Sequence, residues 1–264
     1  MKQSEEKPNW NYEDSPTINL MLDTISKHPG LTELYNLFIN KKCSKLQDHE
    51  VELYFAFHVI TRHPSVQIFY EKEILQGTKK YTPDFTVIWG KKTYYFQMKT
   101  ATYNVDYQRQ IAGMDINSVE FIKHSFFITD STEQLKSALK KGAKFIPEDK
   151  NQRNSFLYIV INNPTAVYDN VGIFQLLYET DSVPNIVQQF LSRQNIQFSG
   201  FFQEEGSWID GIITLEFASY KSIDAISHLL FVNDLSKNIN ETNSNIGEII
   251  RIDQRIDSKT IIEN

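Results

Sequence analysis

Cysteine is nearly absent from this sequence: Cys43 is the single one among 264 residues. One thiol excludes an internal disulfide framework and is typical of proteins that work in a reducing compartment. The chain also lacks any apolar run of the roughly 20 residues that a membrane-spanning helix needs. Its first residues are polar and carry no signal-peptide pattern. The sequence therefore predicts a cytoplasmic protein with no membrane partner.

Several common signatures of function are missing as well. The chain has no glycine-rich phosphate loop and no motif for a Ser/His/Asp nucleophile, and its six histidines show no metal-ligand spacing. We therefore interpret His58 and His63, five residues apart, as structural. A basic excess is also absent, because the formal net charge is −6. That balance argues against a protein that binds DNA tightly by itself, but not against a nuclease that a partner delivers to DNA.

Residues 81–99 carry the most informative pattern. Two runs rich in β-branched and aromatic residues flank Gly90, which predicts an antiparallel hairpin. Alternation places Gln97 and Lys99 on one face of the second strand. Folding at Gly90 brings Asp84 of the first strand beside them. A carboxylate, an amide oxygen and an ammonium are then expected to meet at one end of a sheet.

These side chains predict a site for a divalent cation such as Mg²⁺, which prefers hard oxygen ligands and retains several waters. Asp84 supplies an anionic oxygen, and the side chain of Gln97 supplies a neutral one. Lys99 cannot bind a metal while it is charged, but it can stabilise charge on a scissile phosphate or orient a water. Together these parts suit metal-assisted hydrolysis of a phosphodiester.

A further acid is expected from the helix that the sequence predicts over residues 47–62. Glu52 lies on the apolar stripe of that helix, where an ionised carboxylate is costly unless it is paired or bound to a metal. Glu50 is the alternative, although it lies nearer the helix start, where the helix dipole already favours an acid. We predict that Glu52 completes or supports the metal shell, and the choice between the two acids stays open.

In this order, the helix acid, Pro83-Asp84 and Gln97-x-Lys99 resemble the pattern of the PD-(D/E)XK nucleases, with glutamine where most members carry Glu or Asp. The Gln-x-Lys variant is similar to TnsA, the endonuclease subunit of heteromeric cut-and-paste transposases. The similarity extends over about residues 50–246. It rests on several further segments: Glu52 to Val66, Tyr81 to Phe85, Phe127 to Asp130, Asn170 to Tyr178 and His228 to Thr242.

The resemblance implies a Mg²⁺-dependent DNA endonuclease, in which Mn²⁺ substitutes for Mg²⁺. Glu52, Asp84 and Gln97 would hold the metal, and Lys99 would act on the water or the phosphate. It also implies cleavage at the 5′ ends of a transposon, beside a TnsB-like transposase subunit of the DDE type and a TnsC-like AAA+ regulator. Two alternatives remain open: a stand-alone restriction-type endonuclease, and an inactive nuclease-fold adaptor of the transposition complex.

The mixture of predicted helices and strands favours an α/β protein with a restriction-endonuclease-like mixed sheet flanked by helices. Breaks in the pattern divide the chain into four expected regions. They are an N-terminal attachment region at 1–45, a nuclease domain at 46–163, a smaller and mainly helical winged-helix-like domain at 164–235, and a partner-binding tail at 236–264.

The patterns also predict strands at 66–75, 124–129 and 156–161, and helices at 16–27, 31–41, 105–121, 171–178, 185–193 and 222–231. Ser131 or Thr132 is expected to cap one more helix, which ends at Gly142. Most lysine clusters are expected to be solvated surface. The pairs Lys79-Lys80 and Lys91-Lys92 flank the predicted site in the sequence and have the better claim to phosphate contact.

Overall fold

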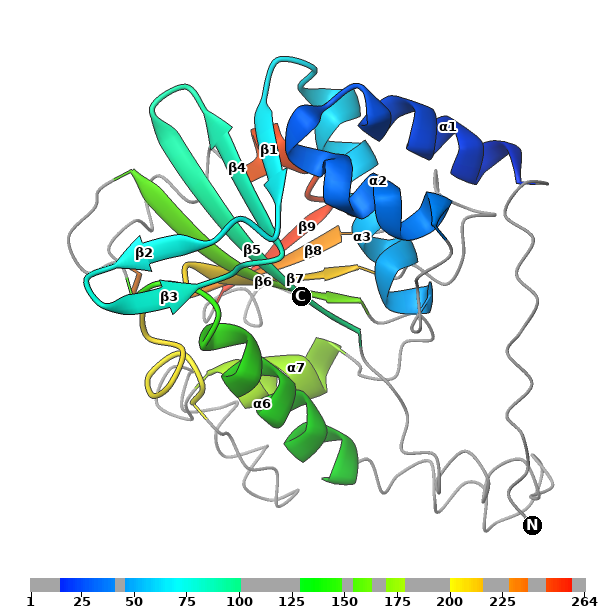
Figure 1. The fold of residues 1–264 in the computed structure, drawn as a ribbon. Coiled ribbons are helices and arrows are strands. Elements are labelled where there is room, and N and C mark those ends of the chain that lie inside the picture. Colours follow the sequence, from blue (N-terminus) through cyan, green and yellow to red (C-terminus); the bar gives the residue numbers. More distant parts are fainter. Residues whose placement is uncertain are drawn as a thin grey trace, which may run out of the picture.

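The computed structural model describes residues 15–40, 46–100, 129–148, 154–162, 170–178, 200–215, 228–236 and 246–257. In these residues the protein has a mixed α/β fold built on a seven-stranded sheet (Figure 1). In spatial order, its strands are β1 (Gln67–Tyr70), β4 (Phe85–Trp89), β5 (Lys92–Thr100), β6 (Ser155–Asn162), β7 (Gly211–Leu215), β8 (His228–Val232) and β9 (Gln254–Ile256). None of the helices in this part of the chain is long and apolar enough to span a membrane.

The sheet combines antiparallel and parallel pairs. β4 pairs with β1 and β5 in antiparallel register, and β7 pairs with β8 in the same way. β5, β6 and β7 run parallel, as do β8 and β9. Parallel neighbours need a crossover connection, and the helices α6 (Thr129–Ala143) and α7 (Asn170–Leu177) lie in the connections that follow β5 and β6.

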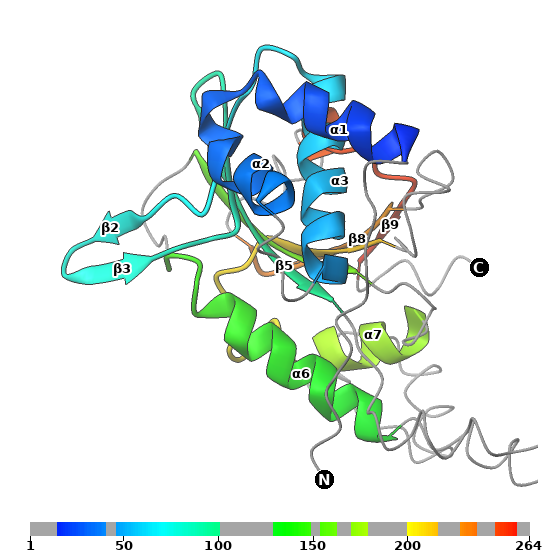
Figure 2. The same cartoon turned by 45° about the vertical axis from the view of Figure 1, so that its right-hand side comes forward.

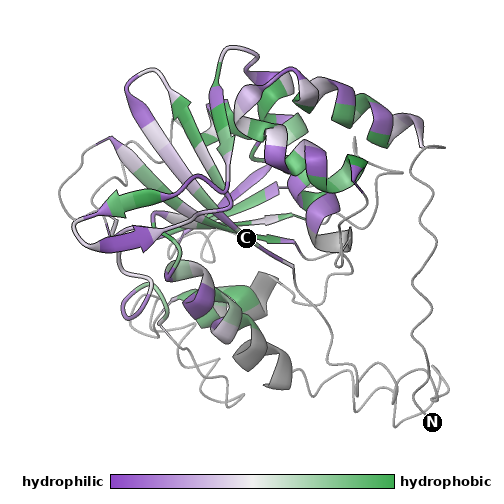
Figure 3. Ribbon diagram, in the orientation of Figure 1, coloured by the Kyte–Doolittle hydropathy of each residue, from purple (hydrophilic) through white to green (hydrophobic). Residues whose placement is uncertain are grey.

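Helices cover both faces of the sheet (Figure 2). α1 (Pro16–Ser26), α2 (Thr32–Ile39) and α3 (Leu46–Arg62) pack on one face, where they bury side chains such as Tyr94 and Phe96 of β5. α6 and α7 pack on the other face, against Leu157 and Ile159 of β6. Apolar and polar residues alternate along α1 and α2 in Figure 3, as expected for helices with one buried face.

The structure confirms the two helices that the sequence predicts near the N-terminus. The side chain of Ser15 accepts a hydrogen bond from the backbone N–H of Ile18 and so caps α1. α2 follows a short 3₁₀ turn, Pro29–Leu31. Ile18 and Leu34 are fully buried in the same core as the central strands. The described part of the expected attachment region is therefore packed into the main body of the protein.

The hairpin expected at Gly90 is confirmed, and a second hairpin that the pattern did not predict precedes it. A strand expected over 66–75 is divided into β1 and β2 (Ile74–Gln76), because Glu71 between them has a positive φ of 47°. β2 pairs with β3 (Lys79–Tyr81) in a separate two-stranded hairpin. In the β4–β5 hairpin Trp89 pairs with Lys92, and Gly90 begins the two-residue loop with a φ of 61°. Glycine tolerates this left-handed conformation without steric cost.

The structure corrects the helix expected over 222–231. Residues 228–232 form β8, which pairs with β7 along its whole length. A short apolar run fits a buried strand as well as a helix, and here the neighbouring strand decides. The described residues show no winged-helix arrangement in 164–235, because β7 and β8 belong to the central sheet.

Other expectations differ in their bounds or lie outside the described residues. α6 begins at Thr129, two residues before the expected cap at Ser131, and it continues through Gly142 to Ala143. The last residue of the strand expected at 124–129 is therefore helical. The rest of that strand and the helices expected at 105–121 and 185–193 lie outside the described residues.

Candidate functional site

Asp84 lies directly before β4, at the end of the sheet, where the register of β4 and β5 brings it to Gln97. Phe85 pairs with Phe96, so the preceding residue on one strand faces the following residue on the other. The Gln97 side chain donates a hydrogen bond from Nε2 to Oδ2 of Asp84 at 2.5 Å. The backbone N–H of Met98 donates to the same oxygen, also at 2.5 Å. The proximity of Asp84 and Gln97 that the hairpin pattern predicts is confirmed.

Lys99 lies two residues after Gln97 on β5, and strand alternation gives both the same face. Its ammonium is near enough to Asp84 to lower the pKa of that carboxyl. The Nζ atom also lies 5.7 Å from the centre of the Phe145 ring, just after α6. The half-buried lysine thus influences the Asp84 carboxyl and has an aromatic ring within reach.

Glu52 projects from α3 and is almost fully buried, at 8% exposed. Its Oε2 atom accepts a hydrogen bond from the hydroxyl of Tyr70 at 2.8 Å and lies 2.9 Å from Nδ1 of His49. The charge of Glu52 raises the pKa of Asp84. Glu50 is also buried, and burial raises the pKa of its carboxyl. Glu52 is therefore the helix acid whose charge reaches Asp84.

The two partners of Glu52 were missed in the sequence. His49 precedes Glu52 by three residues on α3, and this spacing places two side chains on the same helix face. That signal was present in the sequence. Tyr70 lies at the end of β1, 18 residues from Glu52, and only the packing of α3 against the sheet brings the two together. Burial and the neighbouring Glu52 raise the pKa of Tyr70 far above its ordinary value, so the phenol remains a hydrogen-bond donor.

Opposing effects act on the pKa of the Asp84 carboxyl. Burial is the largest cause that raises the pKa of Asp84 to about 7, and the negative charge of Glu52 adds to it. Lys99 and the hydrogen bonds from Met98 and Gln97 act in the opposite direction without cancelling the increase. The Asp84 carboxyl is therefore only partly ionised at pH 7, and a cation bound beside it would favour its charged form.

The residues present fit a divalent cation with hard oxygen ligands. The Oε1 atom of Gln97 is buried and has no hydrogen-bond partner among the described residues. An orphaned amide oxygen beside the carboxylate of Asp84 is a ready ligand, provided the Gln97 amide turns its oxygen toward the ion. The described residues contain no group of three or more His, Cys, Asp or Glu side chains that could hold a metal. A metal at this site therefore depends on Gln97 and on water as well as on the acids.

The register of the β4–β5 hairpin separates the two lysine pairs that flank the site in the sequence. Lys91, in the loop, and Lys92, the first residue of β5, lie six and five residues along the chain from Gln97. At roughly 3.3 Å per residue, Lys91 is about 20 Å from Gln97. Lys79 and Lys80 belong to β3, which ends three residues before Asp84. Lys79 and Lys80 lie five and four residues before Asp84 in the chain, and Lys80 forms an ion pair with Glu73.

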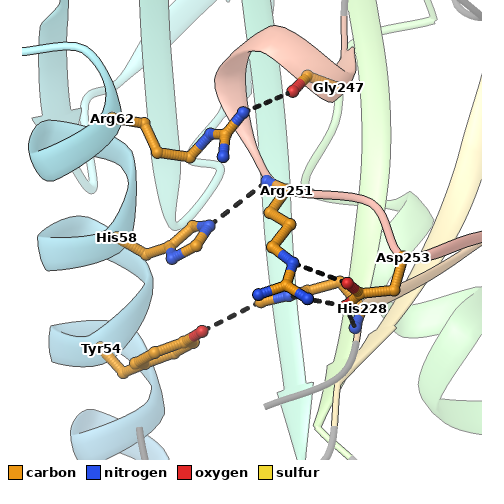
Figure 4. A network of polar contacts seen from close by, with 7 residues as sticks. All are labelled: Tyr54, His58, Arg62, His228, Gly247, Arg251 and Asp253. Atoms are coloured by element: carbon orange, nitrogen blue, oxygen red, sulfur yellow. Dashed lines mark hydrogen bonds and ion pairs between the residues drawn. The ribbon is translucent and has the colours of Figure 1, made fainter. Parts of the chain in front are cut away.

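A second polar cluster joins α3 to the C-terminal part of the chain (Figure 4). His228 is 2% exposed, and its Nε2 lies 3.2 Å from the hydroxyl of Tyr54. The ring of His58 lies 5.0 Å from that of His228, and its Nε2 accepts from the backbone N–H of Arg251 at 3.3 Å. Burial lowers the pKa of each histidine to about 4. Both are therefore neutral at pH 7 and hold elements together.

The comparisons add no relative: no family model, no curated protein and no solved structure matches the chain. What can be inferred of its activity follows from the side chains at the end of β4 and β5 and from the sequence pattern that accompanies them.

Proposed function

We propose that this protein is a metal-dependent DNA endonuclease and acts as the TnsA-like subunit of a heteromeric transposase. The observation that carries the proposal concerns the two ends of one side-chain amide. Nε2 of Gln97 donates a hydrogen bond to Asp84 at 2.5 Å, and the buried Oε1 of the same side chain has no partner in the described structure. Lys99 and Glu52 both act on the charge of the same carboxyl. A seven-stranded mixed sheet with helices on both faces is compatible with a nuclease fold of the restriction-endonuclease type.

The chemistry would divide between a metal ion and the residues of the chain. Mg²⁺, or Mn²⁺ in its place, would supply Lewis acidity and lower the pKa of a bound water. Asp84 and Gln97 would hold the ion, and Glu52 would add its charge from α3. Tyr70 and His49 fix the Glu52 carboxylate in position. Lys99 would lie over the scissile phosphate and stabilise the charge that develops there.

The biological setting comes from the resemblance to TnsA. Such a subunit cuts the 5′ ends of a transposon, on the strand that its partner transposase does not join. A TnsB-like DDE transposase would recognise the ends, and a TnsC-like AAA+ regulator would engage the C-terminal half. Delegated recognition of the ends is consistent with the net charge of −6, because this subunit would not need a large basic footprint of its own.

The test is strand-specific cleavage of a supercoiled plasmid that carries the transposon ends found beside the gene. Wild type is compared with Asp84→Ala and Lys99→Ala, in Mg²⁺ or Mn²⁺, with and without the neighbouring transposase subunit. Lys91→Ala is the matched control, since this lysine lies at the far end of the same hairpin. We expect cuts at the 5′ ends that require the partner, disappear in both site variants and persist in the control.

Other outcomes would replace the proposal. Sequence-specific cuts by the protein alone would identify a restriction-type enzyme that recognises its own site. Absence of cleavage in every condition, with binding to the transposase subunit retained in Asp84→Ala, would identify an inactive adaptor. Cleavage that survives Asp84→Ala would show that another part of the chain carries the chemistry.

A further inference from the structure

The C-terminal end of α6 presents an exposed aromatic ring beside the candidate site. Phe145 is 45% exposed, one of few large apolar side chains that the described residues leave so open to solvent. Its ring lies 5.7 Å from Nζ of Lys99, which is within the range of a cation–π contact. A ring in this position is adjacent to the place where the scissile phosphate would lie.

Backbone hydrogen bonds order the turn that carries Phe145. Its N–H donates to the carbonyl of Gly142 at 3.1 Å, and that of Ile146 donates to Ala143 at 3.3 Å. Ala143 and Ile146 are buried in the core beneath α6. The end of α6 is also fixed to the site itself, because a Cβ on Gly142 would lie 3.6 Å from Cγ of Gln97. Phe145 is therefore exposed on a turn that is hydrogen-bonded and packed against the core.

Two exposed lysines lie near Phe145 in the sequence. Lys141 and Lys144 lie in the same turn, and both side chains are exposed. Lys140 is not available in the same way, since it forms an ion pair with Glu205. An aromatic ring among exposed lysines is the combination that proteins use to bind single-stranded nucleic acid, through base stacking and phosphate contacts.

The β2–β3 hairpin extends this surface. Figures 1 and 2 both show the C-terminal end of α6 below that hairpin. Gln76 of β2 donates from Nε2 to the carbonyl of Glu148 at 3.3 Å, three residues after Phe145. Lys79 pairs with Gln76 across the hairpin and is exposed. Lys80 contributes less, because Glu73 neutralises it at 3.0 Å.

We propose that Phe145, with Lys141, Lys144 and Lys79, binds the DNA strand next to the scissile phosphate, and that the Phe145 ring stacks on one of its bases. This inference rests on the proposed endonuclease function and names the surface that guides the strand to Asp84 and Lys99. Stacking of this kind tolerates any base, so the surface positions a strand without selecting a sequence. Selection of the ends is then left to the partner.

The experiment measures DNA binding by the full-length protein in an Asp84→Asn background, which prevents cleavage. The probes are fluorescein-labelled oligodeoxythymidine and a nicked duplex, titrated at several salt concentrations. The variants are Phe145→Ala, Phe145→Trp and the pair Lys141→Glu with Lys144→Glu. Lys91→Glu, a single charge reversal of the same kind at the loop end of the β4–β5 hairpin and about 20 Å from Gln97, is the control for position. Thermal unfolding of each variant verifies that its fold is intact.

We expect Phe145→Ala to weaken binding to oligodeoxythymidine by roughly 5- to 150-fold and Phe145→Trp to restore it, because alanine removes the stacking platform and tryptophan provides one again. The lysine pair is expected to reduce the salt dependence of single-strand binding by about 0.7 in the logarithmic slope for each phosphate that the two side chains neutralise. The Lys91→Glu variant is expected to bind the DNA probes as tightly as its Asp84→Asn parent does.

Two contrary results have different meanings. If the Asp84→Asn parent binds DNA or the wild type cuts plasmid, and the Phe145 and lysine variants match the Lys91→Glu control, the surface is refuted while the endonuclease stands. If the wild type neither binds these probes nor cuts DNA with its partner present, the proposed function fails and this inference fails with it.

Discussion

Asp84 is the residue at which the energetics of the candidate site are concentrated. Its Oδ2 accepts two hydrogen bonds, yet burial and the charge of Glu52 still raise its pKa to about 7. A carboxyl whose pKa is higher in the folded chain than in the unfolded chain favours folding in its protonated form. Its contribution to stability is therefore complete below pH 3.8 and is lost as the pH rises through 7.

Asp84→Asn is expected to stabilise the protein at pH 8 in the absence of metal, because it removes a half-buried charge. The gain should be on the order of 2 kcal/mol at pH 8 and close to zero at pH 4, where the wild-type carboxyl is protonated in the fold. Urea unfolding in EDTA at the two pH values measures this difference. An equal effect at both would show that charge is not the cause.

Gln97 decides how the site responds to a metal. Gln97→Glu places a second carboxylate against Asp84 within a buried site, and two adjacent acids repel each other unless a cation lies between them. We expect the variant to be less stable than wild type by about 2 kcal/mol in EDTA and to gain more melting temperature from Mn²⁺. Thermal unfolding with and without the ion measures both effects. A gain from Mn²⁺ no larger than that of wild type would argue against Gln97 as a ligand position.

Among the elements, α6 supports the site from the opposite face to α3. Its last turn lies directly on β5 and β6, and Gly142 allows this close approach. A Cβ at that position would lie 3.4 Å from Cδ1 of Ile159 and 3.6 Å from Cγ of Gln97, which is ordinary van der Waals contact. The backbone at Gly142 does not have a positive φ, in contrast to Gly90 in the β4–β5 loop.

Gly142→Ala is therefore expected to stabilise the protein by about 0.5–1 kcal/mol, because alanine loses less backbone entropy on entering a helix. Gly90→Ala provides the contrast. Its Cβ would meet nothing within 4 Å, but a φ of 61° would cost alanine about 1 kcal/mol. Urea unfolding of the two variants should give shifts of opposite sign. Destabilisation by Gly142→Ala would mean that the new contacts with Ile159 and Gln97 cost more free energy than the reduced backbone entropy of the unfolded chain contributes.

At the scale of the whole molecule, the C-terminal segment closes onto α3. Ile246 and Ile250 are buried in the core that α3 shares with the sheet. Arg62 donates to the carbonyl of Gly247 at 2.9 Å, and His58 accepts from the backbone of Arg251 (Figure 4). These contacts join α3 to segments that lie nearly 200 residues later in the chain, and two buried neutral histidines, His58 on α3 and His228 on β8, are part of them.

These histidines make the fold sensitive to acid. The pKa of each of His58 and His228 is lowered to about 4, mainly by burial, and the nearby His228 contributes to the lowering at His58. A histidine with a lowered pKa in the folded state favours folding while it is neutral, so its contribution is complete above pH 6.5 and is lost as the pH falls toward 4.

We expect the protein to lose roughly 2–4 kcal/mol of stability between about pH 6.5 and pH 4.5 from this pair. Urea unfolding across this range measures the loss, and the double variant His58→Gln with His228→Gln should show a flatter profile. The Asp84→Asn background keeps the opposite titration of Asp84 out of the comparison. A profile as steep in the double variant as in its parent would assign the acid sensitivity to other groups.

Local pattern predicted much of the fold near the site. α1, α2, α3, β6 and α7 lie within a few residues of their expected bounds, since capping residues and apolar periodicity act within one element. The contact between Asp84 and Gln97 was also predictable, because a two-residue loop at Gly90 fixes the register of the strands on either side. Of the two partners of Glu52, His49 could have been predicted from its spacing on α3, whereas nothing in the sequence indicates Tyr70.

The sequence by itself determined the hairpin and the meeting of Asp84 with Gln97 at one end of a sheet, because both depend on interactions over a short stretch of chain. The tertiary structure decided what long-range packing controls. It made residues 228–232 a strand by placing them beside β7, and it set Lys91 far from the site and Phe145 next to it. It also joined His58 to His228, 170 residues later. Such contacts carry no local signal, because their free energy comes from burial between segments that meet only when the whole chain folds.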